Sequence, residues 1–357
     1  HSASVRYINL KIAIINNSNN PDMVEYFRGK YSLGFKELIF CSNKVSKQKE
    51  DSFTSSYSRK NCISIWILID FLVGVFLGFR LRLIKTRWIL FDTAHISNIP
   101  LAIVAKVLGI RLAFTIHDWN PHEGKMNLAT RAYNMLVVKF LADHIVCFSE
   151  IEIPLPHSVL RLSGFRSNQT SAQVDENKFL FFGRIEPYKG IRHLSRIASL
   201  LQSKLPKARI AILGAGADPF LDKLNGLSNV ELINRFVPES ELDQAILESL
   251  AVILPYDSAT QSGVLCKSFS CGTPVIAFSV GAIDSYLDNM VSGFLIPHGD
   301  LESFTDAMVN MKEIHTEFRS FIRENFEKEY GREALVSQYK GLIKELLWKA
   351  GYTGMSR

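Results

Sequence analysis

The sequence lacks the patterns that mark disulfide-stapled, zinc-binding, low-complexity or repeat proteins. Its five cysteines form no CxxC pair and no zinc-ligand spacing, and they lie mostly within apolar runs. This arrangement predicts buried thiols in a reducing compartment, and therefore a cytoplasmic protein. The net charge of +6, from 41 basic and 35 acidic residues, is mild. It permits an anionic substrate or an anionic membrane surface, and we expect no nucleic-acid partner.

The composition is that of an ordered globular protein, and the length of 357 residues suits two domains, each with its own core. Short apolar runs alternate with helix-length segments, which is typical of α/β domains with parallel sheets. We predict strands in 10–16, 37–42, 88–92, 112–117, 145–149, 179–182, 209–216, 230–238, 251–256 and 272–277. The polar, serine-rich segment 44–60 is predicted to be a loop.

The most hydrophobic window is 62–79. It runs directly into four basic residues, Arg80, Arg82, Lys85 and Arg87. A helix buried against the sheet is the default interpretation. A helix in the plane of a membrane surface is the second, and it would give a peripheral membrane contact through 62–87. A true span is the third, although Asp70 near the centre would be costly in lipid.

The stretch 179–194 joins an apolar strand to an amphipathic helix through a loop that carries two cations. The strand turns at Gly183, the loop contains Arg184 and Lys189, and the helix resumes after Gly190. The start of a helix offers free N–H groups and a partial positive charge, so anions gather there. With two added cations, this loop is suited to a diphosphate. Solvated surface charges are the alternative.

The same stretch resembles the FGRI-x-x-x-KG signature of the family 4 glycosyltransferases, which are retaining enzymes of the GT-B fold. In that family the arginine and lysine, here Arg184 and Lys189, hold the diphosphate of a nucleotide-sugar donor. The resemblance implies an α/β protein with two Rossmann-like domains, parallel sheets facing a cleft, and a C-terminal helix that returns to the first domain. We expect an acceptor-binding domain at 1–168, a donor-binding domain at 169–331 and the returning helix at 332–357.

The segment 257–274 carries a second resemblance. Most family 4 enzymes place two glutamates here, eight residues apart, but the matching positions are Ala259 and Lys267. We interpret Lys267 as solvated rather than as a phosphate ligand. The chain resembles instead a subgroup that reads ATQSGV, which implies donor binding by Gln261, Ser262, Gly263 and Val264. Ser262 also suits an N-cap, with the free amides of the next two residues turned toward a phosphate.

Further positions carry weaker signals. His117 follows an apolar strand, and such a histidine is structural more often than functional; the resemblance places it near the donor sugar. Gly214 lies in a GAG turn that permits either a tight turn or close approach to a ligand. Phe236 and Val237 match the family's turn that cups the nucleobase. A metal site of Asp118, His122 and Glu123 is disfavoured, because the family's members generally use no bound metal.

Together with the two-cation loop, the resemblance implies a metal-independent, retaining hexosyl- or pentosyltransferase. His117, Arg184 and Lys189 would be catalytic, and Gly183 and Gly214 would join the donor site. The donor would be a nucleotide-diphosphate sugar of UDP or GDP type, with no other cofactor. The acceptor would be a saccharide, free or lipid-linked, in bacterial surface polysaccharide synthesis at the inner face of the cell membrane. Two alternatives stay open: a non-catalytic nucleotide-binding or scaffold protein, and a nucleotide-sugar epimerase, both of GT-B fold.

Overall fold

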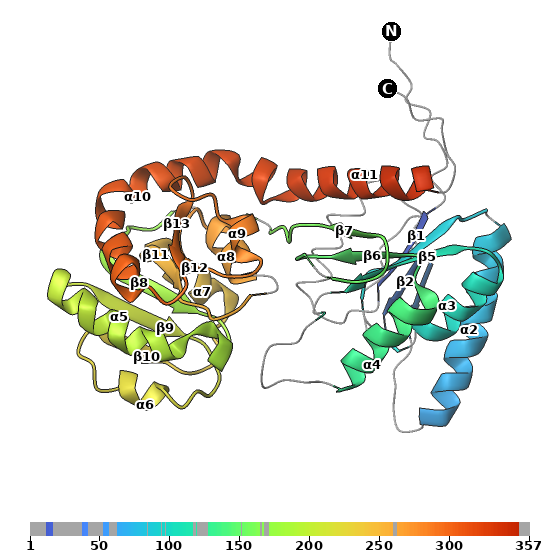
Figure 1. Ribbon diagram of the computed structural model, residues 1–357, viewed down its shortest axis with the longest axis horizontal. Coiled ribbons are helices and arrows are strands. Elements are labelled where there is room, and N and C mark those ends of the chain that lie inside the picture. The colour runs from blue at the N-terminus through green and yellow to red at the C-terminus, as the bar shows by residue number, and fades with distance from the viewer. Residues whose placement is uncertain are drawn as a thin grey trace, which may run out of the picture. The chain divides into compact units, whose positions relative to one another are not determined.

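The chain forms two compact α/β units in the computed structural model (Figure 1). Unit 1 comprises residues 1–121, 125–160 and 336–357, and unit 2 comprises 122–124 and 161–335. The structure describes residues 12–16, 38–41, 53–56, 63–83, 85–93, 95–96, 98–116, 119, 128–150, 152–164, 166–167, 171–259 and 263–349.

Unit 1 is built on a seven-stranded sheet with the order β3-β2-β1-β4-β5-β6-β7, and neighbouring strands run parallel. The strands are β1 (Ile12–Asn16), β2 (Leu38–Cys41), β3 (Phe53–Ser56), β4 (Trp88–Phe91), β5 (Arg111–Ile116), β6 (His144–Cys147) and β7 (His157–Val159). The helices are α2 (Ile63–Leu83), α3 (Asn98–Val107), α4 (Leu128–Leu136) with the π-helical turn η1 (Val137–Leu141), and α11 (Arg332–Lys349), of which residues 336–349 lie in unit 1. Tyr339 of α11 hydrogen-bonds to Asp92, directly after β4.

Unit 2 contains a six-stranded parallel sheet with the order β10-β9-β8-β11-β12-β13. Its strands are β8 (Asp175–Phe182), β9 (Arg209–Leu213), β10 (Val230–Ile233), β11 (Ser249–Leu254), β12 (Val275–Ser279) and β13 (Gly293–Pro297). Its helices are η2 (Pro187–Lys189), α5 (Ile191–Lys204), α6 (Leu221–Leu224), α7 (Glu239–Glu248), α8 (Gly263–Ser270), α9 (Ile283–Tyr286) and α10 (Leu301–Glu329).

The strand order of unit 2 positions its functional edge. The chain proceeds from β8 through β9 to β10, and then returns to the other side of β8 with β11. The direction of winding therefore reverses between β8 and β11, and open parallel sheets bind ligands beyond the carboxyl ends of the strands at such a point. Helix α5 follows β8 at this point. The five apolar residues that its helical spacing predicts to be buried are all fully buried, namely Ile191, Leu194, Ile197, Ala198 and Leu201.

The prediction of two α/β units with parallel sheets is confirmed, but the prediction of a loop at 44–60 is wrong. Strand β3 lies inside the predicted loop 44–60, and its polar residues pair at the edge of the sheet. Strand β7 occupies the other edge of the sheet. Helix α10 in unit 2 is one continuous helix, and its buried face includes Phe318 and Ile322.

Helix α2 has two different faces. Leu77 and Leu81 are buried on the side that packs against α3, where Gly78 has no room for a side chain because a Cβ would lie 2.6 Å from Val104 Cγ1. The opposite side carries four large apolar residues that are 54–80% exposed, Leu72, Phe76, Phe79 and Leu83. The default interpretation of a buried helix therefore holds for one face only. No helix among the described residues combines the length and the hydropathy that a bilayer span requires.

Candidate functional site

The loop after β8 is held by close backbone packing. Gly183 has a φ of +105°, which favours glycine, and its N–H donates to Leu213 O at 2.9 Å. A Cβ at Gly214 would lie 1.8 Å from Gly183 O, so the ends of β8 and β9 meet backbone to backbone. The packing of the two strands is thus sufficient to require glycine at position 214.

Lys189 is the buried cation of this loop. Lys189 is only 6% exposed to solvent, although lysine is almost never buried without a partner. A Cβ built on Gly183 would lie 2.9 Å from Lys189 Nζ and 3.3 Å from Val264 Cγ2. Three of the residues predicted to bind the donor therefore meet where β8 ends and α8 begins. Within the part of the chain that the structure describes, Nζ has no hydrogen-bond or ion-pair partner, and it lies 5.5 Å from the ring centre of Tyr256.

Burial changes the acidity of this lysine. The pKa of Lys189 is lowered from 10.5 to about 8. Desolvation by burial is the largest cause, the carboxylate of Glu186 opposes it, and the charge of Arg184 adds to the lowering. The ammonium group is therefore charged at neutral pH but poorly stabilised. An anion placed beside Nζ would replace the hydration that burial has removed.

Arg184 is the exposed cation of the loop, with a side chain that is 72% accessible. Its Nη1 lies 3.1 Å from Oε1 of Glu186, whose side chain is buried. Two cations and one carboxylate leave the loop with one net positive charge. Glu186 was not among the residues predicted for the site, although it is the only acidic residue between Arg184 and Lys189. Its ion pair with Arg184 orients the guanidinium at the mouth of the loop.

The N-terminus of α8 supplies the other side of the site. The helix begins at Gly263, which is exposed, and a Cβ there would meet nothing within 4 Å. The first amides of a helix have no intrahelical acceptor, so they are free for an anion or for water. The structure thus brings Gly183, Lys189 and Val264 together. His117, Gln261 and Ser262 lie outside the described residues, as do Asp118, His122 and Glu123 of the disfavoured metal site.

The turn after β10 contains the two residues expected at the nucleobase. Phe236 is 81% exposed, and Val237 packs partly against the core. An exposed aromatic ring is available for stacking on a base. Arg235, directly before it, is ion-paired to Glu241 of α7.

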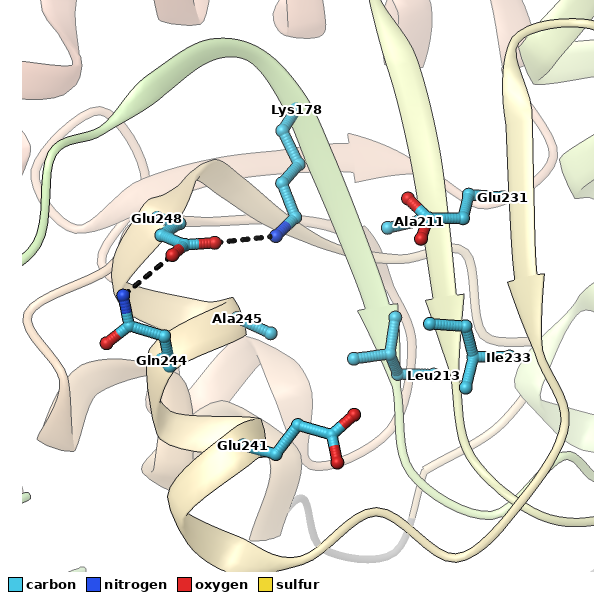
Figure 2. A pocket seen from close by; sticks show the side chains of 9 residues that line it. All are labelled: Lys178, Ala211, Leu213, Glu231, Ile233, Glu241, Gln244, Ala245 and Glu248. Atoms are coloured by element: carbon cyan, nitrogen blue, oxygen red, sulfur yellow. Dashed lines mark hydrogen bonds and ion pairs between the residues drawn. The ribbon is translucent and has the colours of Figure 1, made fainter.

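A pocket of about 240 Å³ lies between α7 and the sheet (Figure 2). Its lining includes Leu213 and Ile233, the last residues of β9 and β10, together with Glu231, Glu241 and Glu248. The lining has more acidic than basic side chains, and Lys178 already pairs with Glu248 at 3.2 Å. None of the predicted donor-binding residues lines this pocket, and its charge does not suit a diphosphate.

Lys267 differs from its expected state. Its Nζ lies 2.7 Å from Glu239 Oε1 and 2.6 Å from Asp243 Oδ1, and most of the side chain is shielded from solvent. The prediction of a solvated Lys267 is therefore wrong. Ala259, at the other position where the family has glutamate, is buried, and its carbonyl accepts a hydrogen bond from Ala282 N at 2.9 Å.

A known protein family matches the part of the chain that contains the two-cation loop of Arg184 and Lys189. Residues 176–313 match the family of glycosyl transferases group 1. The matched stretch contains both cations and the N-terminus of α8. An uncharacterised glycosyltransferase of Haemophilus influenzae is 23% identical over 319 residues, which cover 85% of this chain and 85% of that protein. A D-inositol 3-phosphate glycosyltransferase of Saccharomonospora viridis is 31% identical over 144 residues, or 37% of this chain and 33% of that enzyme.

Solved structures show the same fold. Anabaena HepE in complex with UDP and glucose superposes with a TM-score of 0.64 at 13% identity, over 94% of this chain and 100% of that one. Sucrose-phosphate synthase of Thermosynechococcus elongatus gives 0.66 at 15% identity, over 95% and 99% of the two chains. The GT-B fold implied by the FGRI signature is confirmed. Together with the family match, these findings support glycosyltransferase activity.

Proposed function

We propose that this chain is a retaining glycosyltransferase that moves a sugar from a nucleotide-diphosphate sugar to a saccharide acceptor. The observation that carries the proposal is the buried ammonium group of Lys189, which meets Gly183 and the first turn of α8 without a partner among the described residues. The departing diphosphate supplies a negatively charged partner for this ammonium group. Its charge grows as the glycosidic bond breaks, so the lysine stabilises the transition state more than the ground state.

The remaining residues have distinct roles in this mechanism. Arg184 binds the diphosphate from the solvent side, with two parallel N–H donors available in its planar group. The amides of Gly263 and Val264 face the phosphate from the helix start. His117 positions the donor sugar, as the resemblance implies. The acceptor proton passes to an oxygen of the leaving phosphate on the same face of the sugar, which accounts for retention without a separate base.

UDP-sugars are the first donors to test. Anabaena HepE was solved in complexes with UDP and with UDP-glucose, and the fold of this chain matches it. The exposed ring of Phe236 supports stacking of a base after β10.

A thermal-shift panel of UDP, GDP, ADP and dTDP tests the diphosphate site. The preferred nucleotide should raise the unfolding temperature of the wild type, because a ligand stabilises the state it binds. The shift should largely disappear in Arg184→Ala and remain in Arg196→Ala, an exposed arginine on α5 that serves as the matched control. An equal shift in wild type and Arg184→Ala would contradict the proposal.

Transfer assays with the preferred donor then separate the functions. Sugar transfer to a saccharide acceptor, abolished in Lys189→Ala, supports the glycosyltransferase. Nucleotide binding without turnover at every donor would indicate a non-catalytic protein, and epimer formed without acceptor would indicate an epimerase.

We also propose that α2 places the protein on an anionic membrane surface, where a lipid-linked acceptor would be reached. Its four exposed apolar residues recur on one helical face, and exposed cations follow directly at Arg80, Arg82, Lys85 and Arg87. An apolar face beside basic residues suits an in-plane contact with acidic lipid headgroups.

Co-sedimentation with vesicles tests this contact. Binding should require acidic lipid, and it should fall in Phe76→Ser and Phe79→Ser. It should not change in Phe236→Ser, which removes an even more exposed ring from unit 2. Equal binding by all variants, or no binding at low salt, would show that α2 does not act at a membrane.

A further inference from the structure

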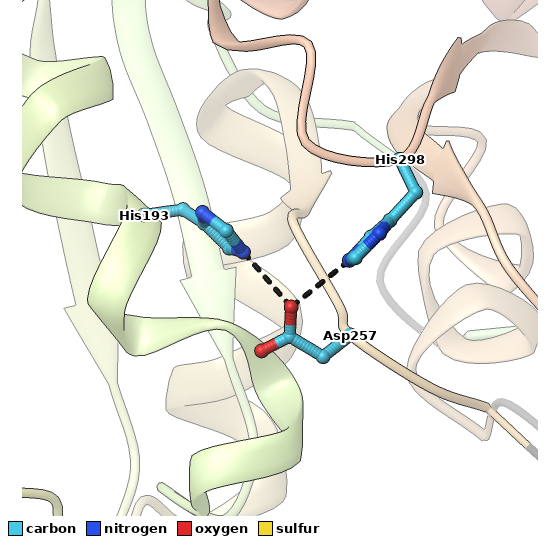
Figure 3. Close-up of side chains that lie close together, drawn as sticks. All are labelled: His193, Asp257 and His298. Carbon is cyan, nitrogen blue, oxygen red and sulfur yellow. Dashed lines mark hydrogen bonds and ion pairs between the residues drawn. The ribbon is translucent and has the colours of Figure 1, made fainter.

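A second polar cluster of unit 2 joins three segments that lie far apart in the sequence (Figure 3). His193 lies in the first turn of α5, Asp257 follows β11, and His298 follows β13. Nε2 of His193 is 2.9 Å from Oδ1 of Asp257, and Nε2 of His298 is 3.0 Å from the same oxygen. Among the described residues, these three form a group whose ligand atoms all lie within 4.8 Å of one another.

We propose that His193, Asp257 and His298 bind a transition-metal ion of the Zn²⁺ type, at a site separate from the diphosphate site. Two imidazole nitrogens and one carboxylate oxygen are a ligand set that Zn²⁺ prefers, and three protein ligands leave a fourth position open for water. Tetrahedral Zn²⁺ would separate the ligand atoms by about 3.3 Å. The two nitrogen–oxygen distances are close to this value already, so small rotations of the side chains would suffice.

One aromatic side chain packs against both imidazole rings. Phe278 of β12 makes edge-to-face contacts with both, at ring-centre distances of 5.4 Å to His193 and 5.5 Å to His298. The His193 and His298 rings are perpendicular to each other, with centres 6.1 Å apart. Both rings point their Nε2 atoms at the carboxylate. Ligands whose rotamers are fixed by packing bind a metal ion with less loss of conformational entropy.

The cluster is accessible to solvent on one side, and an entering ion would have to displace one cation. The side chain of His193 is 14% exposed and that of His298 is 43% exposed, so the cluster is closed on one side and open on the other. Arg192 competes for the carboxylate, since its Nη2 lies 2.7 Å from Oδ1. This guanidinium is half exposed and can move into solvent when a divalent ion takes its place.

An ion at this position would stabilise the loop that carries Lys189. Asp257 N donates to Tyr188 O at 2.8 Å, and a Cβ at Gly190 would lie 1.7 Å from Pro255 O. The segment after β11 therefore packs directly on the two-cation loop. Bridging it to α5 and to the segment after β13 would restrain that loop, and the ion itself takes no part in sugar transfer.

Metal titration of the chelator-treated full chain tests the site. Isothermal titration should show one Zn²⁺ per chain, and Co²⁺ should give the visible absorption of a tetrahedral site. Affinity should fall at least tenfold in His298→Ala and should be unchanged in His315→Ala, a half-buried histidine of α10 far along the chain from the cluster. No stoichiometric binding, or equal affinity in wild type and His298→Ala, would overturn the proposal.

Thermal unfolding provides an independent measurement that does not depend on enzymatic activity. Zn²⁺ should raise the unfolding temperature of wild type and His315→Ala, and it should not raise that of His298→Ala. Circular dichroism before metal addition establishes that each variant is folded. Asp257→Asn is the second variant, and a Zn²⁺ shift retained in both variants would exclude the cluster as the site. Since no step uses a nucleotide, the result is independent of the proposed donor site.

Discussion

Replacing Lys189 with methionine should stabilise the empty protein at neutral pH. Burial lowers the pKa of this lysine from 10.5 to about 8. Each pKa unit corresponds to about 1.4 kcal/mol, so the charged form costs about 3 kcal/mol at pH 7. Methionine has a similar length and no charge. The contact with Tyr256 is lost and Glu186 retains only Arg184 as a nearby loop cation, so we expect a net gain of about 1–2 kcal/mol.

The pH dependence separates this effect from ordinary repacking. Between pH 8 and 10.5 the unfolded chain holds the Lys189 proton more tightly than the folded chain does. The stability that this group contributes is therefore present above 10.5 and lost as the pH falls through about 8. From pH 7 to 9.5 the wild type should gain about 2 kcal/mol in free energy of unfolding relative to Lys189→Met.

Urea unfolding measures the difference if the two units are followed separately. All four tryptophans, Trp66, Trp88, Trp119 and Trp348, belong to unit 1, so tryptophan fluorescence reports that unit alone. Circular dichroism records the unfolding of both units. An unfolding transition that is seen by circular dichroism but not by tryptophan fluorescence therefore belongs to unit 2. The difference between wild type and variant should appear in that transition. A variant less stable than wild type at pH 7, or a difference that does not change with pH, would refute the desolvation argument.

Three further outcomes follow from the same geometry. UDP affinity of the wild type, measured by titration calorimetry, should weaken by about tenfold from pH 7 to 9, because Lys189 loses its proton above about 8; Lys189→Met should show no such change. Gly214→Ala should destabilise unit 2 by more than about 3 kcal/mol in urea unfolding, since its Cβ would meet Gly183 O at 1.8 Å, whereas Gly226→Ala, with open space around it, should be nearly neutral. Gly341→Ala, also in open space and within α11, should raise the free energy of unfolding by about 0.5–1 kcal/mol.

The sequence by itself determined the elements whose cause is local. Apolar runs of strand length became the central strands of both sheets, and the buried face of α5 has the spacing seen in the sequence. The two-cation loop was also visible, because glycines and charges at its ends are a property of neighbouring residues. Hydrophobic periodicity and turn chemistry act over a few residues, so they can be recognised without knowing the fold.

Only the tertiary structure decided how each side chain is solvated and paired. The polar residues of β3 form a strand because a neighbouring strand is present, and Lys267 is ion-paired because α7 lies beside α8. The lowered pKa of Lys189 and the meeting of His193, Asp257 and His298 arise in the same way. Burial and electrostatics depend on which distant segments pack together, and the local sequence carries no information about that packing.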